Sequence, residues 1–346
     1  MNDRTEPIPV AVVGAGHMGR HHVRIYKELP GAQLVGVVDR DLSRAKALAA
    51  QFGTDAHDTV EPLLGRIRAA SVAVPTVAHL EVARPLLEHS ISVLIEKPLA
   101  PDSAACRAML EVARRHGAVL QVGHTERFNP VVRAMHKMQV APQFIETHRI
   151  SPFTFRSADV GVVMDMMIHD IDIVLSLVKA SPVRIDAVGV NVLGPHEDIA
   201  NARVTFEGGC VANLTASRLA LKTERKIRVF SPEAYLSLDY QKKAGVAIKK
   251  AANLDLLKFA REHKAEDLSQ LAGTDFGSLV KVEPLEVDDR EPLRVELEAF
   301  LDTVGNGSPP AVSAEDGAAA VDLAERITQT LREHNWSLTD VDKPEE

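Results

Sequence analysis

The feature that most constrains the fold is a glycine-rich turn near the start of the chain. The stretch VVGAGHMGRHH places Gly14, Gly16 and Gly19 in a G-x-G-x-x-G pattern. The apolar run IPVAVV, typical of a buried strand, precedes this turn, and an amphipathic helical pattern follows it. Asp39 ends the next apolar run, twenty residues beyond Gly19. This spacing is typical of a βαβ unit that begins a doubly wound parallel sheet.

Each glycine of the turn has a physical reason to be there. Gly14 permits a tight turn, Gly16 lets the backbone approach a pyrophosphate, and Gly19 lets the helix pack closely on the strand. The helix N-terminus offers free N–H groups to phosphates. Asp39 would accept hydrogen bonds from the adenosine ribose and repel a 2′-phosphate, although Arg40 could accommodate that phosphate. The motif therefore predicts NAD rather than NADP, with FAD, S-adenosylmethionine or no ligand as alternatives. The expected cofactor contacts here are Gly14, Gly16, His17, Met18, Gly19, Asp39 and Arg40.

Composition narrows the class of protein. The chain has 346 residues, 45% hydrophobic and 25% charged, which is ordinary for a soluble protein of two domains. A net charge of −8 argues against nucleic acid as a partner, because nucleic-acid-binding domains are usually basic. The sequence has two cysteines, no cluster with metal-ligand spacing, no signal peptide and no apolar run long enough to span a membrane. We therefore expect a cytoplasmic protein without a metal and without membrane association.

The pattern of apolar runs predicts two domains. Over residues 1–125, short apolar runs alternate with helical patterns, which indicates five parallel strands and an N-terminal Rossmann domain. Residues 126–346 are expected to form an α/β domain with an open, mostly antiparallel sheet and helices on one face, with hairpin signals such as Gly208-Gly209. Its strand candidates cover residues 143–150, 183–193, 200–209, 210–218, 224–232 and 234–240.

Two later segments have a weaker pattern. Residues 241–290 are hard to interpret, and the run KKAGVAIKKAAN within them favours a solvated charged face over a binding patch. Near the end of the chain, Ser313 and Asp316 form a capping-box signal at the start of a helix.

The most unusual stretch is VMDMMIHDIDIV at residues 163–174, an apolar run with three aspartates and a histidine. On a helix, Asp165, His169 and Asp172 lie at spacings of four and three and share one narrow stripe. Asp170 lies off this stripe. A helix that is apolar nearly all round is normally buried, so the stripe would face an interior cleft. The alternative is a solvated stripe with one core histidine.

The order of motifs along the chain is similar to that of a known family. GAGHMG, VAVPTVAH, EKP, VGHTERFNP, DMMIHDID and PLRVELEAFLDTV follow one another, and over essentially its whole length the chain resembles the Gfo/Idh/MocA oxidoreductases. The resemblance implies a Rossmann domain followed by an α/β domain with an open antiparallel sheet. It also implies an NAD-dependent dehydrogenase that acts on a CH–OH group of a sugar.

The resemblance also implies the catalytic residues, which are Lys97, His169 and Asp165. Lys97, the lysine of EKP, can polarise or protonate the reacting oxygen. His169 can take a proton from a sugar hydroxyl, while Asp165 or Asp172 orients its ring, and a hydride passes to the nicotinamide. Whether Lys97 or His169 accepts the proton stays open at this point.

Further contacts follow from the same motifs. The segments expected beside the nicotinamide half of the cofactor contribute Pro75, Thr76, His79, Glu96, Lys97 and His124. The expected substrate contacts are Lys97, Arg127, Asn129, Arg156, Asp165, His169 and Asp172. Arginines can bind a diphosphate through two hydrogen bonds, but Arg127, Asn129 and Arg156 could equally form an interdomain salt bridge or a helix cap. The remaining histidines, including His21 and His22, are expected at the surface or in packing.

Within the family, VGHTERFNP and FRSADVGVVMDMMIHDIDIVLSL resemble the UDP-N-acetylglucosamine 3-dehydrogenases. That resemblance implies a nucleotide-sugar substrate whose 3-hydroxyl becomes a ketone, and an aminotransferase partner that acts next in lipid A precursor synthesis. The alternatives are another sugar, inositol or uronic-acid nucleotide-sugar dehydrogenase, an NAD-dependent glycosidase, or a non-catalytic NAD sensor. Because one face of the second sheet would be bare, we also expect a homodimer or homotetramer.

Overall fold

The computed structural model describes residues 6–154, 160–250 and 280–333. Its first sheet is parallel, with the strand order β3-β2-β1-β4-β5-β6, and its central strands are almost completely buried. This is the predicted doubly wound domain, with one strand more than the five expected, because β3 is too short to give an apolar run. The strands are β1 (Ile8–Val13), β2 (Ala32–Val38), β3 (Asp55–His57), β4 (Ala69–Val72), β5 (Ser92–Glu96) and β6 (Leu120–Gly123).

The helices of this domain begin and end where local chemistry predicts. The carboxylate of Asp41 accepts the Ser43 and Arg44 N–H groups, and helix α2 then ends at Gly53 in the left-handed region. In the same way, the Asp102 side chain caps the start of helix α4, and the helix ends at Gly117 in the left-handed region. The helices are α1 (His17–Glu28), α2 (Leu42–Phe52), α3 (His79–Glu88) and α4 (Ser103–His116), with short 3₁₀ turns η1 (Glu61–Leu63) and η2 (Thr76–Ala78).

The second sheet has eight strands in the order β14-β13-β12-β11-β7-β10-β9-β8, antiparallel except for the β7–β10 pair. Within the run expected as a solvated charged face, Ala244–Lys250 form strand β13, which was not predicted and which pairs with β12 and β14; residues 251–253 of that run lie outside the described residues. The strands are β7 (Phe144–Ile150), β8 (Pro182–Val190), β9 (Ile199–Phe206), β10 (Val211–Ser217), β11 (Glu224–Phe230), β12 (Ala234–Asp239), β13 (Ala244–Lys250) and β14 (Val280–Pro284).

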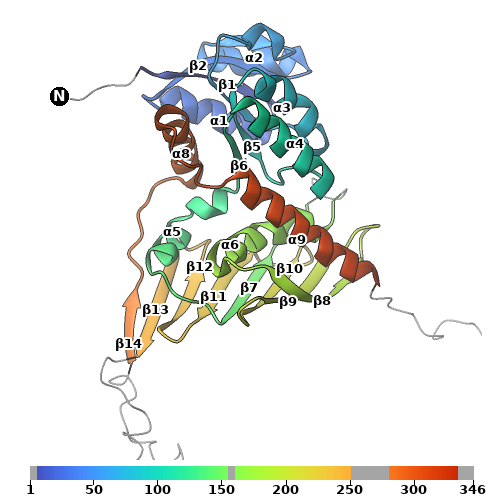
Figure 1. Cartoon of the computed structure of the whole chain (residues 1–346), viewed down its shortest axis with the longest axis vertical. Helices are drawn as coiled ribbons and strands as arrows, with labels where there is room; N and C mark the ends of the chain where they lie inside the picture. Colours follow the sequence, from blue (N-terminus) through green and yellow to red (C-terminus); the bar gives the residue numbers. More distant parts are fainter. Residues whose placement is uncertain (1–5, 155–159, 251–279, 334–346) are drawn as a thin grey trace, which may run out of the picture.

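Among the described residues, helices cover one face of this sheet and leave the opposite face open (Figure 1). Strand β7 alternates between partly exposed and buried side chains, as expected for a sheet with one covered face. The covering segments lie between the sheet and the first domain. They are the 3₁₀ turn η3 (Thr125–Phe128), α5 (Pro130–Lys137), the π-helical turn η5 (Val163–Met167), α6 (Ile168–Val178) and α9 (Ala314–Glu333).

Helix α8 (Pro292–Asn306) departs from the predicted division of the chain. It lies beside α1 in Figure 1, and Leu297 and Phe300 join the hydrophobic cluster that holds Val10 and Ile25 of the first domain. The prediction that all residues after 125 belong to the second domain is therefore wrong for α8. Its apolar stripe fills the remaining uncovered part of the first sheet, so this core is built from both ends of the chain.

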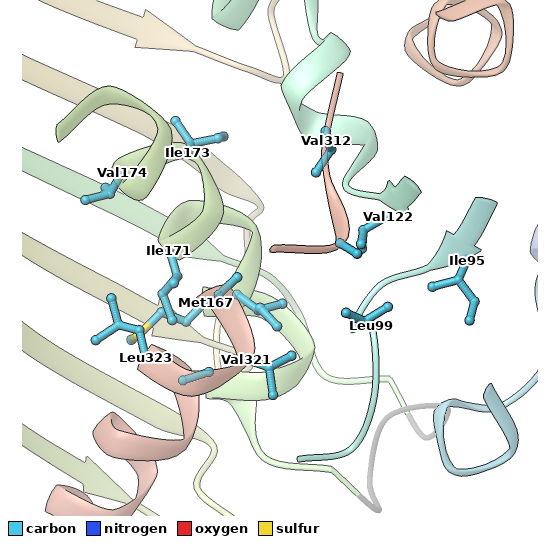
Figure 2. Packing of buried hydrophobic residues seen from close by; sticks show 14 of the residues in the cluster. Ile95, Leu99, Val122, Met167, Ile171, Ile173, Val174, Val312, Val321 and Leu323 are labelled. Atoms are coloured by element: carbon cyan, nitrogen blue, oxygen red, sulfur yellow. The ribbon is translucent and has the colours of Figure 1, made fainter. Parts of the chain in front are cut away.

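A continuous hydrophobic cluster joins the two domains (Figure 2). Leu99 and Val122 of the first domain meet Met167 of the π-helical turn and Val321 of α9. The N-terminus of α9 forms the predicted capping box, in which Ser313 N–H donates to the Asp316 carboxylate and Asp316 N–H donates to the Ser313 hydroxyl. This shared core holds the end of β5 against the start of α6. The residues predicted to be catalytic lie next to these two places in the chain.

A candidate active site between the two domains

The glycine-rich turn has the shape that a dinucleotide requires. Gly14 has φ +103°, and a Cβ on it would lie 2.5 Å from the Ala73 carbonyl oxygen. A Cβ on Gly19 would lie 1.7 Å from the Gly14 carbonyl oxygen, so the close approach of α1 excludes any side chain there. No atom lies within 4 Å of a Cβ built on Gly16, and no side chain caps α1. The N–H groups of the first helical turn are therefore free to bind a pyrophosphate.

Asp39 is fixed beside this turn. One carboxylate oxygen accepts the Ala15 N–H at 2.8 Å and the other accepts the Asp41 N–H at 2.9 Å. A carboxylate oxygen can accept more than one hydrogen bond, so both remain able to accept from ribose hydroxyls. The side chains of His17 and Arg40 lie at the surface near the turn, and Met18 is half-buried. These residues thus fit an NAD molecule bound along the edge of the first sheet.

The segments expected at the nicotinamide end have more varied roles. Pro75 is exposed and Thr76 is half-buried, so both can contact a ligand. His79 is buried, and its two ring nitrogens lie 3.1 Å and 3.0 Å from the carbonyl oxygens of Leu99 and Val74. Its imidazole therefore ties together the loops after β4 and β5 and leaves no ring nitrogen for the cofactor. That His79 lines the nicotinamide half of the cofactor stays a prediction.

Lys97 reaches from the end of β5 into the start of the polar helix. Its ammonium donates to the Asp165 carbonyl oxygen at 2.7 Å and lies 3.4 Å from the Asp165 carboxylate. Asp165 belongs to the π-helical turn rather than to a regular α-helix, and its side chain is 30% exposed. Such turns are common at functional sites. The two residues thus meet at a partly open position between the domains, as the polar stripe predicted.

His169 lies one turn further along, in an electrostatically unusual place. Its ring is half-buried, and its Nδ1 is enclosed with no hydrogen-bond partner among the described residues. The ring of His124 stands edge-on to it, with 6.3 Å between centroids. Burial, followed by the charge of Lys97, holds the pKa of His169 well below its usual 6.5. The imidazole is therefore neutral at pH 7, and its unprotonated ring nitrogen can accept a hydrogen bond.

The remaining aspartates form buried ion pairs. Asp172 accepts two hydrogen bonds from Arg127, at 2.6 Å and 2.9 Å. Among the described residues, neither Asp172 nor Asp165 hydrogen-bonds the His169 ring, so the predicted orienting contact is not present. Asp170 is buried as well and accepts two hydrogen bonds from Arg149 of β7. Asp170 lies off the stripe, as the helical spacing predicted, and its side chain points at the sheet rather than at the cleft.

The candidate substrate contacts divide in the same way. Arg127 forms a salt bridge, to Asp172 within the second domain rather than between domains, and Asn129 caps α5 by accepting the Val131 N–H at 3.3 Å. Arg156 lies outside the described residues. Lys97, Asp165 and His169 are thus the members of the predicted set that lie together and retain partly exposed groups.

Models of two protein-family domains match the chain. The model described as "Oxidoreductase family, NAD-binding Rossmann fold" matches residues 8–124, and the model of the GFO/IDH/MocA C-terminal domain matches residues 132–237. The chain belongs to the Gfo/Idh/MocA oxidoreductase family. The Rossmann fold of this family accounts for the glycine-rich turn and for Asp39, and NAD is the cofactor of the chain.

Two characterised members of the Gfo/Idh/MocA family show how the chain compares in sequence. It is 37% identical over 230 residues to the UDP-N-acetylglucosamine 3-dehydrogenase of Acidithiobacillus ferrooxidans. The matched region covers 66% of this chain and 73% of that protein. It is 22% identical over 340 residues to the inositol 2-dehydrogenase of Rhizobium meliloti, covering 93% and 96% of the two chains.

Solved structures agree with the family assignment. The structure of the UDP-N-acetylglucosamine 3-dehydrogenase from Acidithiobacillus ferrooxidans has a TM-score of 0.83 at 30% identity, with 94% of this chain and 98% of that chain covered. Levoglucosan dehydrogenase in complex with NADH has a TM-score of 0.79 at 16% identity, which shows a shared fold. Across the described residues, none of the helices is both long and apolar enough to cross a membrane, and no group of three or more histidine, cysteine, aspartate or glutamate side chains is arranged to hold a metal ion.

Sequence reasoning missed Glu296 of α8, which is fully buried with one oxygen accepting from the Thr125 hydroxyl. Glu96, predicted beside the nicotinamide, is buried and hydrogen-bonded at 2.9 Å to His22, which is a packing residue as expected. A signal for Glu296 was present, because it stands on the apolar stripe of α8 between Leu293 and Phe300. A charged residue at such a position indicates a buried polar contact.

Proposed function

We propose that this chain uses NAD to oxidise the 3-hydroxyl of a nucleotide sugar, with UDP-N-acetylglucosamine as the substrate. The observation that carries the proposal is the pairing of Lys97 with Asp165 beside a neutral His169. The relative that is 37% identical and bears that activity in its name supports the choice of substrate. A non-catalytic sensor would need no proton acceptor at this position.

In the proposed reaction, the sugar 3-hydroxyl lies between His169 and Lys97. His169 accepts the hydroxyl proton, because burial keeps its imidazole neutral. Lys97 donates to the Asp165 carbonyl and lies beside the Asp165 carboxylate, and an ammonium has three N–H groups. One N–H therefore remains to stabilise the oxygen as its negative charge develops. Bound NAD supplies the acceptor for the hydride that leaves the sugar carbon.

Asp165 has a positioning role in this scheme. Its backbone carbonyl and its carboxylate hold the Lys97 ammonium toward α6. The π-helical turn allows this, because it brings the carbonyl and the side chain of one residue toward the same partner. The product would be the 3-keto nucleotide sugar, with the proton on His169 and the hydride on the cofactor. The 3-keto group would then be converted to an amine by an aminotransferase partner, in the synthesis of lipid A precursors.

We propose further that the protein works in the cytoplasm as a homodimer or homotetramer that packs through the open face of its second sheet. Val190, Phe230 and Val282 lie on that face by register and are 42%, 37% and 57% exposed. Exposed apolar side chains on a sheet that no helix covers favour association.

Substrate-dependent NADH formation tests the proposed function. Purified protein with NAD should produce NADH with UDP-N-acetylglucosamine at a kcat/KM at least tenfold above that for myo-inositol, free N-acetylglucosamine or a UDP-uronic acid. Mass spectrometry should show a nucleotide sugar two hydrogen atoms lighter. A preference for myo-inositol would favour the inositol dehydrogenase, whereas sugar release without net NADH would favour the glycosidase. Absence of turnover with all of them would favour the sensor.

A further inference from the structure

A nucleotide sugar brings a diphosphate to the site, and a site usually binds phosphate oxygens with arginine or lysine. Three of the cations near His169 are already engaged. Lys97 donates to Asp165, Arg127 holds Asp172 through two hydrogen bonds, and Arg149 holds Asp170 in the same way. The last two pairs are almost completely buried. Displacing either arginine would leave a buried aspartate uncompensated, so neither is suited to bind a ligand.

Arg225 differs from these three cations. It stands at the start of β11 directly across from Arg149 of β7, so its side chain lies on the face of the sheet that α6 covers. Its guanidinium is 45% exposed, whereas the Arg149 side chain is 4% exposed. The positive charge of Arg225 is among the causes that lower the pKa of His169, so the two side chains are close enough to interact. Arg225 therefore lies at the rim of the candidate site.

The guanidinium of Arg225 is held only weakly. Its nearest acidic partner is Glu126, at 3.5 Å, and the same Glu126 oxygen lies 3.3 Å from Arg149. Within the described ranges, no hydrogen bond joins the Arg225 guanidinium to another residue. On the same strand but on the open face, Arg228 donates to Glu146 at 3.1 Å. Arg225 thus combines exposure, a position at the site and unused N–H donors.

We propose that Arg225 binds the diphosphate of the substrate. This inference rests on the proposed function, because a free sugar or an inositol has no phosphate for it to bind. The planar guanidinium presents two parallel N–H groups, which match two phosphate oxygens. Glu126 holds the Arg225 guanidinium near the site. When a phosphate replaces Glu126 beside Arg225, Glu126 stays paired with Arg149. Arg225 is therefore a substrate-binding residue and takes no part in proton or hydride transfer.

Kinetics of Arg225→Gln and of a matched control test the inference. Arg225→Gln should raise KM for UDP-N-acetylglucosamine about 10- to 100-fold, as expected for loss of charged hydrogen bonds, and should change kcat and KM for NAD about threefold or less. Arg228→Gln removes an equally exposed arginine from the same strand and should leave all three constants unchanged. A similar KM for the two variants would overturn the inference, and so would a loss of kcat without a change in KM.

Calorimetry with UDP separates the inference from the proposed function. The NAD-loaded wild-type protein should bind UDP, and Arg225→Gln should weaken this binding by a factor similar to the rise in KM. If the wild type turns over UDP-N-acetylglucosamine and both proteins bind UDP equally, the assignment of Arg225 fails and the proposed function stands. If the wild type neither binds UDP nor turns over the nucleotide sugar, both fail. UDP binding that Arg225→Gln weakens supports the inference even when the sugar preference proves to be different.

Discussion

At the scale of single residues, the site contains histidine ring nitrogens that have no hydrogen-bond partner, next to charged side chains that are paired with each other. His124 has neither ring nitrogen hydrogen-bonded within the described residues, and burial lowers its pKa. The enclosed His169 Nδ1 also has no partner among these residues, whereas the Asp172 carboxylate accepts two hydrogen bonds from Arg127. Enclosed polar atoms without partners are costly, and they are usually retained where a ligand completes them. The unpaired nitrogen of His169, beside Lys97, supports the proposed site of the chemistry.

Removal of His169 or Lys97 should therefore affect turnover much more than folding. His169→Ala and Lys97→Ala should each lower kcat about 10²- to 10⁴-fold, the usual effect of losing a general acid or base. NAD binding, followed by fluorescence quenching, should stay within a few-fold of the wild type, because neither residue approaches the glycine-rich turn. Asp165→Asn should be impaired as well, since it weakens the hold on Lys97. Near-normal turnover of both alanine variants would contradict the assignment of the active site.

Asp39 should decide the choice between the two nicotinamide cofactors. In the wild type NAD should bind more tightly than NADP, because the carboxylate accepts ribose hydroxyls and repels a 2′-phosphate. Asp39→Ala should narrow that preference through weaker NAD binding and stronger NADP binding. Equilibrium titration of both cofactors against both proteins measures the effect. NADP binding more tightly than NAD to the wild type would be inconsistent with this role of Asp39.

At the scale of secondary-structure elements, α6 is attached to its surroundings by ion pairs as well as by apolar packing. Asp165 lies against Lys97 at the end of β5, Asp172 pairs with Arg127 of η3, and Asp170 pairs with Arg149 of β7. Because Asp165 belongs to η5, directly before α6, the pairs join the η5–α6 segment to three different elements and fix it in both position and rotation. Ordering of this kind is needed where reacting groups must hold their geometry.

Asp170→Asn tests the structural part of this arrangement. It should destabilise the protein by about 3–5 kcal/mol, because it leaves the Arg149 guanidinium buried with only part of its compensating charge. Asp186→Asn, which breaks an exposed pair with Arg184 on β8, should leave stability nearly unchanged. Urea unfolding of the two variants measures the difference. Equal midpoints would show that the Asp170–Arg149 pair adds no net stability.

Helix α8 carries a buried carboxyl group whose charge state depends on folding. Burial, reinforced by the charge of Glu96, raises the pKa of Glu296 well above its usual 4.5. The folded state therefore retains a proton on Glu296 that the unfolded state releases above about pH 4.5. Its contribution to stability is complete below that pH and decreases as the pH rises toward the folded-state pKa.

Glu296→Gln removes this dependence on pH, because an amide needs no proton. The variant should gain thermal stability relative to the wild type as the pH rises from 5 toward 8, and should lose that advantage below pH 4.5. The amide can still accept from the Thr125 hydroxyl. Melting temperatures of both proteins across this range test the prediction. A difference that does not vary with pH would mean that Glu296 is ionised in the folded protein.

At the scale of the whole molecule, the proposed homodimer or homotetramer would pack through the open face of the second sheet. Light scattering at micromolar concentration should give two or four times the mass of one chain. Phe230→Glu places a charge among the rings of Phe144 and Tyr235 on that face and should lower the mass. Val77→Glu, at an 82% exposed apolar position in the first domain, should not. A wild-type protein that stays monomeric at this concentration would rule out the proposed assembly.

The sequence by itself determined the architecture and the catalytic residue types. Strand and helix periodicities, capping residues and glycines act over a few neighbouring residues, so their spacing is sufficient to predict the parallel sheet, the capping box and the glycine-rich turn. The same local rules predicted that Asp165 and His169 share a polar stripe. Motif order supplied the family and, through it, Lys97.

Only the tertiary structure decided which charged residues act on a ligand and which hold the fold. Asp170 and Asp172 are alike in sequence, yet each is paired with an arginine from a distant segment, Arg149 and Arg127. Helix α8 packs on the first domain, and Glu296 becomes buried there. The apolar surface of the first sheet that α8 covers lies next to this helix in space, although it is far from it in the sequence. The free energy of burying a charge depends on all the groups around it. Those groups come from segments that only the folded chain brings together.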